Sequence, residues 1–201
     1  MDLEAALGDL QTQDYFVWDD FLSQAEVKNI AADYEILFSS GAFKLAGTGN
    51  QAGSQKLNAS IRSDQTYWLE PLALTPAQRV FWERLEILKK EINERFFLGL
   101  WNLDGHYSHY PVGGHYQTHL DRFHSDDRRT ISMVLYFNSA WIKADGGELR
   151  FHFPNAEIKT LDIAPMSGRL VCFLSDKILH EVLTAQRPRL SFAGWWMRRA
   201  H

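Results

Sequence analysis

Residues 130–137, TISMVLYF, and residues 189–197, RLSFAGWWM, are two apolar runs rich in β-branched and aromatic side chains. Such runs are typical of β-strands. They belong to a series of short runs of this kind, which lie at residues 106–110, 115–121, 130–137, 147–153, 169–174, 180–185 and 189–197. Turn material rich in Gly, Pro, Ser and Asp separates the runs, and no helical pattern interrupts the series. This half of the chain is therefore predicted to close into a sandwich or jelly roll.

Two helices are predicted upstream of the strand series. Residues 23–41 begin with a capping box formed by Ser23 and Glu26, and apolar side chains follow at helical spacing. Residues 75–99 begin with a second capping box, Thr-Pro-Ala-Gln, which has proline at the first helical position. We expect both helices to pack against the outside of the β-structure.

The chain of 201 residues, with 45% hydrophobic and 13% aromatic content, fits one folded domain spanning residues 1–201. Residues 1–104 are expected to supply helices and flanking strands, and residues 105–199 the core. The predicted fold class is α+β, with a double-stranded β-helix (jelly-roll) core supported by N-terminal helices. Residues 44–57, rich in Gly, Ser, Gln and Asn, are predicted to form a mobile loop.

Composition also narrows the class of function. The net charge of −4 does not favour binding to nucleic acid or to an acidic membrane. Cys172 is the only cysteine and lies in an apolar run, so it is expected to be a buried thiol. The start of the chain lacks the pattern of a secretion signal, and no apolar run reaches the ~18 residues of a membrane span. A cytoplasmic monomer is the expectation.

His119 and Asp121 lie on either side of Leu120, so on a strand their side chains share one face. They could form an ion pair or provide two metal ligands. His115 and His119 also have the spacing of a helical zinc site, but a Pro-Val-Gly-Gly turn precedes them and the glutamate of HExxH is absent. His180, near the end of the strand series, offers a third ligand. Two histidines and one carboxylate occupy one face of an octahedral metal, which suits non-haem Fe(II).

Arg189 begins a strand whose other residues are mostly apolar. A guanidinium that enters such a barrel requires an anion, because an unpaired buried charge costs several kcal/mol. The partner could be an internal Asp or Glu. It could also be the distal carboxylate of a dicarboxylic cosubstrate, held by two hydrogen bonds.

These residues resemble the Fe(II)- and 2-oxoglutarate-dependent dioxygenases, and most closely the prolyl hydroxylases of the Egl-nine (hypoxia-inducible-factor) type and their bacterial relatives. The resemblance covers residues 58–199. It implies three metal ligands and three residues that bind 2-oxoglutarate, with Tyr136 assisting the arginine. The ligands are His119, Asp121 and His180, and the cosubstrate-binding residues are Arg189, Tyr136 and Tyr110.

The segment IRSDQTYWLE, residues 61–70, is similar to a segment that marks the prolyl hydroxylase branch. The resemblance implies a structural ion pair between Asp64 and Arg129, which would hold this segment against the barrel. It also implies a substrate pocket, for which the candidates are Trp195, Met133, Leu149 and Arg62.

By resemblance, the protein hydroxylates a prolyl residue in a protein such as elongation factor Tu and releases succinate and CO2. The implied cofactors are Fe(II), 2-oxoglutarate and O2, with ascorbate as a reductant, and residues 44–57 would be a lid over the substrate. Two other classes remain open. One is a 2-oxoglutarate oxygenase acting on another side chain, a small molecule or a nucleic-acid base. The other is a non-catalytic barrel that binds a metal or ligand as a sensor.

Overall fold

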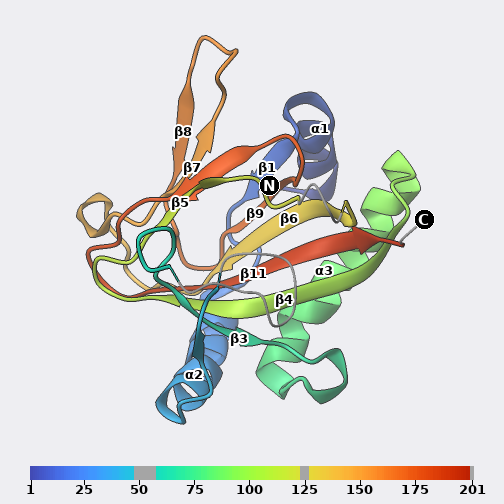
Figure 1. The fold of residues 1–201 in the computed structure, drawn as a ribbon. Helices are drawn as coiled ribbons and strands as arrows, with labels where there is room; N and C mark the ends of the chain where they lie inside the picture. The colour runs from blue at the N-terminus through green and yellow to red at the C-terminus, as the bar shows by residue number, and fades with distance from the viewer. Residues whose placement is uncertain (48–57, 123–126, 200–201) are drawn as a thin grey trace.

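The computed structural model describes residues 1–47, 58–122 and 127–199 (Figure 1). The helices are α1 (Leu3–Gln13), α2 (Gln24–Ser39) and α3 (Pro76–Phe96), with short 3-10 turns at Pro71–Ala73 and Lys143–Asp145. The strands are β1 (Tyr15–Trp18), β2 (Lys44–Leu45), β3 (Gln65–Trp68), β4 (Leu100–Tyr110), β5 (Tyr116–His119), β6 (Arg129–Tyr136), β7 (Leu149–His152), β8 (Thr160–Ile163), β9 (Leu170–Leu174), β10 (Leu179–Val182) and β11 (Arg189–Arg198).

The strands form two antiparallel sheets. The major sheet has the order β1-β9-β6-β11-β4-β3-β2, and the minor sheet has the order β5-β10-β7-β8. From β4 to β7 and again from β8 to β11, consecutive strands alternate between the sheets, and the β7–β8 hairpin lies within the minor sheet, in the manner of a jelly roll (Figure 1). The predicted α+β fold with a double-stranded β-helix core is therefore confirmed. The strands β1, β2 and β3 extend the major sheet at its two edges.

Both predicted helices begin at their capping boxes. At the start of α2 the hydroxyl of Ser23 accepts from the backbone N–H of Glu26, whose carboxylate accepts from the N–H of Ser23. Thr75 and Gln78 make the same reciprocal pair at the start of α3. The second helix ends earlier than its glycine predicts, because Phe97 already adopts the left-handed conformation that ends the helix. Helix α1 and strand β1 were not predicted.

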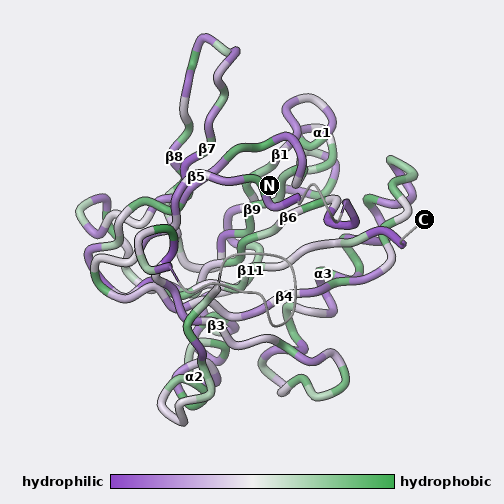
Figure 2. The backbone as a smooth tube through the Cα atoms, viewed as in Figure 1, coloured by the Kyte–Doolittle hydropathy of each residue, from purple (hydrophilic) through white to green (hydrophobic). Residues whose placement is uncertain are grey.

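The three helices cover the outer face of the major sheet (Figure 1). Side chains alternate along β11, so that Phe192 and Trp196 belong to the core under the helices while Arg189, Ser191 and Trp195 face the space between the sheets. The alternation of hydrophobic and hydrophilic residues can be followed along the strands in Figure 2. Cys172 is a buried free thiol in this core, as expected.

The minor sheet has a different outer face. Arg150 of β7 pairs with Asp162 of β8, and His152 of β7 pairs with Glu181 of β10. The hairpin of β7 and β8 projects beyond the two sheets (Figure 1). None of the described helices is long and apolar enough to cross a membrane.

The predicted loop of residues 44–57 is described only in part. Lys44 and Leu45 form β2, which pairs with β3. Residues 48–57 lie outside the described residues, so the role of a lid stays a prediction.

Candidate metal and anion site

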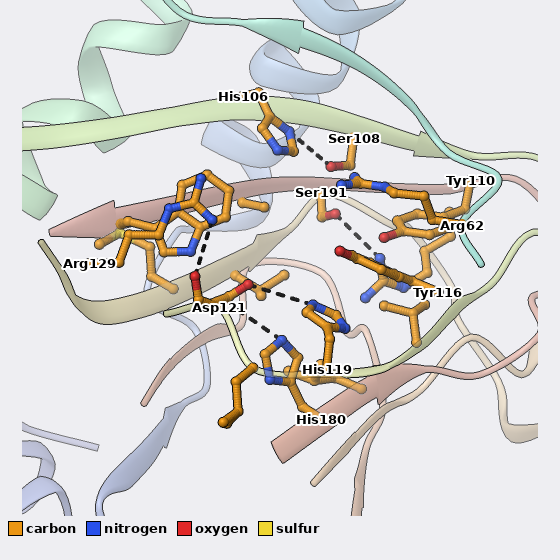
Figure 3. A pocket seen from close by; sticks show the side chains of 18 of the residues that line it. Arg62, His106, Ser108, Tyr110, Tyr116, His119, Asp121, Arg129, His180 and Ser191 are labelled. Atoms are coloured by element: carbon orange, nitrogen blue, oxygen red, sulfur yellow. Dashed lines mark hydrogen bonds and ion pairs between the residues drawn. The ribbon is translucent and has the colours of Figure 1, made fainter. Parts of the chain in front are cut away.

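A cavity of about 130 Å³ lies between the inner faces of the two sheets (Figure 3). Its lining combines polar and charged side chains with apolar ones. Its lining includes Arg62, Trp68, His106, Ser108, Tyr110, Tyr116, His119, Asp121, Arg129, Leu149, His180, Val182, Arg189, Ser191 and Trp195.

His119, Asp121 and His180 come together at the minor-sheet side of the cavity. His119 and His180 are register partners on β5 and β10, and Asp121 follows β5 directly. The Nε2 atom of His119 lies 3.5 Å from one carboxylate oxygen of Asp121, and the Nε2 atom of His180 lies 3.7 Å from the other. One ligand atom from each residue lies within 4.8 Å of the others, which is the geometry of a metal site.

Backbone carbonyls orient both imidazoles. The Nδ1 atom of His119 donates to the carbonyl of Gln117 at 2.7 Å, and that of His180 donates to the carbonyl of Ile178 at 2.9 Å. A carbonyl oxygen can only accept, so Nδ1 carries a proton in each ring, and in the neutral form of the ring Nε2 offers the lone pair. Both lone pairs therefore lie on the side of Asp121, in the arrangement that metal-binding histidines use.

The protonation states also suit a cation. Burial lowers the pKa of His180 to about 4, with a further contribution from neighbouring His119, so this imidazole is neutral at pH 7. Burial alone would raise the pKa of Asp121, but His180, His119 and Arg129 hold it well below its usual range. The site therefore presents the neutral imidazole of His180 and the carboxylate of Asp121 beside the imidazole of His119.

Arg189 lies at the opposite side of the cavity and is only 1% exposed. Its Nε donates to the carbonyl of Gly147 at 2.8 Å, and its Nη1 donates to the hydroxyl of Ser191 at 3.3 Å. Its Nη2 has no partner among the described residues, and neither has the hydroxyl of Tyr136. The guanidinium carbon lies 5.0 Å from the ring centres of Tyr136 and Tyr110.

The side chains around Arg189 decide between the two kinds of partner considered for it. Within the described residues no Asp or Glu pairs with Arg189, so the alternative of an internal carboxylate partner is not found there. Burial raises the pKa of the Tyr136 hydroxyl, which therefore stays protonated and can donate. A buried cation beside an unused hydroxyl donor is a site for an anion, because leaving it empty costs desolvation free energy.

The structure gives Asp64 a different partner from the predicted one. Its buried carboxylate accepts two hydrogen bonds from Arg62, at 2.8 and 2.6 Å, rather than pairing with Arg129. Arg62 lies two residues away on an extended segment, so its side chain is on the same side as Asp64 and reaches it first. The guanidinium of Arg129 instead lies 3.6 Å from the ring centre of Trp195 and donates to the backbone carbonyl of Asp121.

The four predicted pocket residues, Trp195, Met133, Leu149 and Arg62, all line the cavity. Met133 also packs in the core under the helices. Sequence reasoning missed His106 and Ser108 of β4, which line the cavity and hydrogen-bond to each other at 3.1 Å. Their alternation with Tyr110 along one strand is the signal that could have identified them.

Comparisons with known proteins identify the family to which the chain belongs. Residues 105–197 match the family model described as the 2OG-Fe(II) oxygenase superfamily. The crystal structure of a Pseudomonas putida prolyl-4-hydroxylase is 37% identical, with a TM-score of 0.86 over 99% of this chain and 100% of that one. Human Egl nine homolog 1 is 31% identical over 192 residues, which are 90% of this chain and 43% of that protein. A Trichoplax adhaerens prolyl hydroxylase, solved with a hypoxia-inducible-factor peptide, is 24% identical and shares the fold, with a TM-score of 0.79 over 97% of this chain and 88% of that one.

The fold, the cavity and these similarities define the class of protein: the chain belongs to the 2OG-Fe(II) oxygenase superfamily. Within that superfamily it is homologous to the Egl nine and bacterial prolyl hydroxylases. The chain spans less than half the length of the mouse and human Egl nine relatives that it matches.

Proposed function

We propose that this protein is an Fe(II)- and 2-oxoglutarate-dependent dioxygenase that hydroxylates a prolyl residue in a protein substrate. The observation that carries the proposal is the pairing of two sites in one cavity. A cluster of two histidines and one carboxylate lies on one side, and a buried arginine with an unused donor lies on the other.

The residues present fit the metal that the family implies. His119, Asp121 and His180 would hold Fe(II), because their Nε2 and carboxylate atoms already converge and both imidazoles are oriented through Nδ1. When bound, Fe(II) with 2-oxoglutarate and O2 supplies the oxidising chemistry that hydroxylates the substrate and releases succinate and CO2. In this proposal ascorbate serves as the reductant that keeps the iron ferrous.

The chain's own contribution is to bind and orient the reactants. Arg189, whose Nη2 has no partner within the described part of the chain, would receive the distal carboxylate of 2-oxoglutarate, and the Tyr136 hydroxyl would donate a second hydrogen bond. The ring of Tyr110 packs against the guanidinium of Arg189 at this end of the cavity. A dicarboxylate held in this way has its other end directed across the cavity toward the metal ligands, which is the positioning that oxygenase chemistry needs.

The walls of the cavity would place the substrate and exclude water. Trp195, Leu149 and Val182 give apolar surface beside the metal ligands, on which a pyrrolidine ring can pack. Similarity to the Pseudomonas putida prolyl-4-hydroxylase supports proline as the target residue. We take elongation factor Tu as the first protein to test, and a cytoplasmic monomer as the form in which the enzyme acts.

The test measures succinate formed from 2-oxoglutarate by the purified protein with Fe(II) and ascorbate. Peptide masses of elongation factor Tu and of a whole-cell extract are compared in parallel. His180→Ala should abolish turnover, whereas His152→Ala should retain it, because His152 lies on the neighbouring strand and pairs with Glu181 on the outer face.

A gain of one oxygen on a proline, seen only with the active protein, would support the proposal and identify the substrate. A gain of one oxygen on a residue other than proline would support the oxygenase activity but overturn the assignment of proline as the target. The absence of both succinate and modification would overturn the proposal and favour a metal-binding sensor.

A further inference from the structure

We propose that Tyr116 is a positioning residue for His119, and that Arg62 and Asp64 hold Tyr116 in place. The proposal rests on the metal site of the proposed function and concerns how the chain prepares that site. Figure 3 shows Tyr116 lying between Arg62 and His119.

The two histidines of the cluster have unequal support. His180 is on β10, between two neighbouring strands, and its ring packs edge-on against Phe173 at 4.7 Å between centres. His119 is on β5, which is an edge strand of the minor sheet among the described residues and pairs there with β10. Its side chain is 19% exposed, compared with 6% for His180. The core therefore fixes one imidazole, and the other needs a different support.

Tyr116 supplies that support through a stacked contact. Its ring lies parallel to the imidazole of His119, with 3.7 Å between centres and 19° between planes. The hydrogen bond from Nδ1 to the carbonyl of Gln117 fixes one edge of the imidazole. The stack fixes the plane, so the two contacts together determine where Nε2 points.

A β-bulge makes this stack possible. Residues three apart on a regular strand point to opposite faces, so Tyr116 and His119 would not meet. In the pairing of β5 with β10, His119 is opposite His180 and Tyr116 is opposite Val182. Three steps along β5 thus match two steps along β10, and the extra residue brings both rings to one side. Bulges beside active sites commonly redirect side chains in this way.

The other side of Tyr116 is also held. The guanidinium carbon of Arg62 lies 4.4 Å from the ring centre of Tyr116, a cation–π contact. Arg62 is fixed by its two hydrogen bonds to Asp64, which is 1% exposed. Backbone hydrogen bonds from Gln117 to Ile61 and from Ser63 to His115 tie this segment to the strand that carries His119. The support therefore runs from a buried ion pair through Tyr116 to a metal ligand.

The experiment measures the dissociation constant for Mn²⁺, added alone as a redox-stable probe, together with the unfolding temperature. Tyr116→Leu removes the stack and should weaken Mn²⁺ binding about 3- to 10-fold. Tyr116→Phe retains the aromatic ring, so its dissociation constant for Mn²⁺ should lie within about twofold of the wild-type value. This change is smaller than the one expected from loss of an aromatic contact. The matched control is Phe38→Leu. Phe38 stacks on His109 with 4.0 Å between ring centres and 17° between ring planes, and this pair is not part of the metal cluster. This control should leave Mn²⁺ affinity unchanged.

A second variant tests the support without altering Tyr116. Arg62→Met combined with Asp64→Asn removes the cation from the ring and avoids an unpaired buried carboxylate. It should weaken Mn²⁺ binding about 2- to 3-fold, as expected for loss of a cation–π contact. This variant decides the question if Tyr116→Leu does not fold.

Wild-type affinity in folded Tyr116→Leu, or in the double variant if the first does not fold, would overturn the proposal while leaving the metal site intact. Failure of the wild-type protein to bind Mn²⁺, or equal binding by His119→Ala, would instead overturn the metal site of the proposed function and the positioning role with it. The two failures are thus distinguishable.

Discussion

The two sheets of this protein differ in what covers their outer faces. The major sheet is buried under three helices, whose side chains join those of the strands in one core. The minor sheet carries ion pairs on its outer face, such as Arg150 with Asp162. Yet each sheet supplies one half of the candidate site, with Arg189 on the major sheet and His180 on the minor sheet. The larger hydrophobic core therefore lies under the helices on one sheet, whereas the site depends on both sheets.

The largest expected effect tests the helix-covered face. Phe81 of α3 is fully buried, and its ring centre lies 5.0 Å from that of Phe192 on β11. Phe81→Ala leaves a cavity between helix and sheet and should lower the free energy of unfolding by about 3–5 kcal/mol. Urea unfolding followed by circular dichroism measures this. A loss below about 1 kcal/mol would contradict the assignment of stability to this face.

The next prediction separates the anion site from the metal site. Arg189→Met removes the buried guanidinium and should raise the 2-oxoglutarate concentration needed for half-maximal succinate formation about 100-fold, or about 3 kcal/mol. Binding of Mn²⁺ alone should change little, since the metal ligands come from the other sheet. Arg187→Met is the control, because Arg187 pairs with Asp145 outside the cavity. If Arg189→Met needs the same 2-oxoglutarate concentration for half-maximal succinate formation as wild type, Arg189 does not bind 2-oxoglutarate.

A pH dependence tests the inner face of the major sheet. Burial, together with Arg62, lowers the pKa of His106 on β4 to about 4, below the value of about 6.5 in the unfolded chain. The unfolded state binds the proton first, so the free energy of unfolding falls as the pH decreases from about 6.5 to about 4. His180 titrates in the same window.

The contribution of His106 is isolated by comparing wild type with His106→Gln. Between pH 6.5 and pH 5 the wild-type protein should lose up to about 2 kcal/mol more than the variant. Urea titrations at the two pH values measure the difference. Equal losses in the two proteins would show that His106 does not contribute to the pH dependence.

The smallest expected effect concerns the outer face of the minor sheet. Arg150 and Asp162 are partly exposed, and water screens their attraction. Arg150→Ala should therefore change the free energy of unfolding by less than about 1 kcal/mol, and it should leave succinate formation unchanged. If Arg150→Ala lowers the free energy of unfolding as much as Phe81→Ala does, the outer faces of the two sheets do not differ in their contribution to stability.

Local signals explain which elements could be predicted. The capping boxes at Ser23 and Thr75 mark helix starts through contacts within four residues, so the sequence alone identifies them. Helix α1 lacks such a box and buries only Ala6, Leu7 and Leu10, and therefore gives a weak pattern. Its strand partner β1 is short and depends on pairing with the distant β9.

The candidate site also contains features that local sequence predicts and features that depend on pairing with distant strands. The spacing of His119 and Asp121 predicts that both side chains lie on one side of the chain, and the structure brings them together with His180. The stack of Tyr116 on His119 could not be predicted, since the alternation of a regular strand separates these residues and the bulge that unites them arises from pairing with β10. The partner of Asp64 was predicted wrongly because resemblance favoured Arg129, whereas proximity along the chain favours Arg62.

The place of β11 in the major sheet has a consequence for how the protein is made. This strand lies between β6 and β4 and pairs with both over most of its length. On the ribosome, β4 and β6 are synthesised well before residues 189–198, so each exposes an open edge until the strand between them emerges. Open edges recruit other chains. The strand that carries Arg189 therefore also covers the two edges at which the nascent chain would otherwise offer pairing sites to other chains.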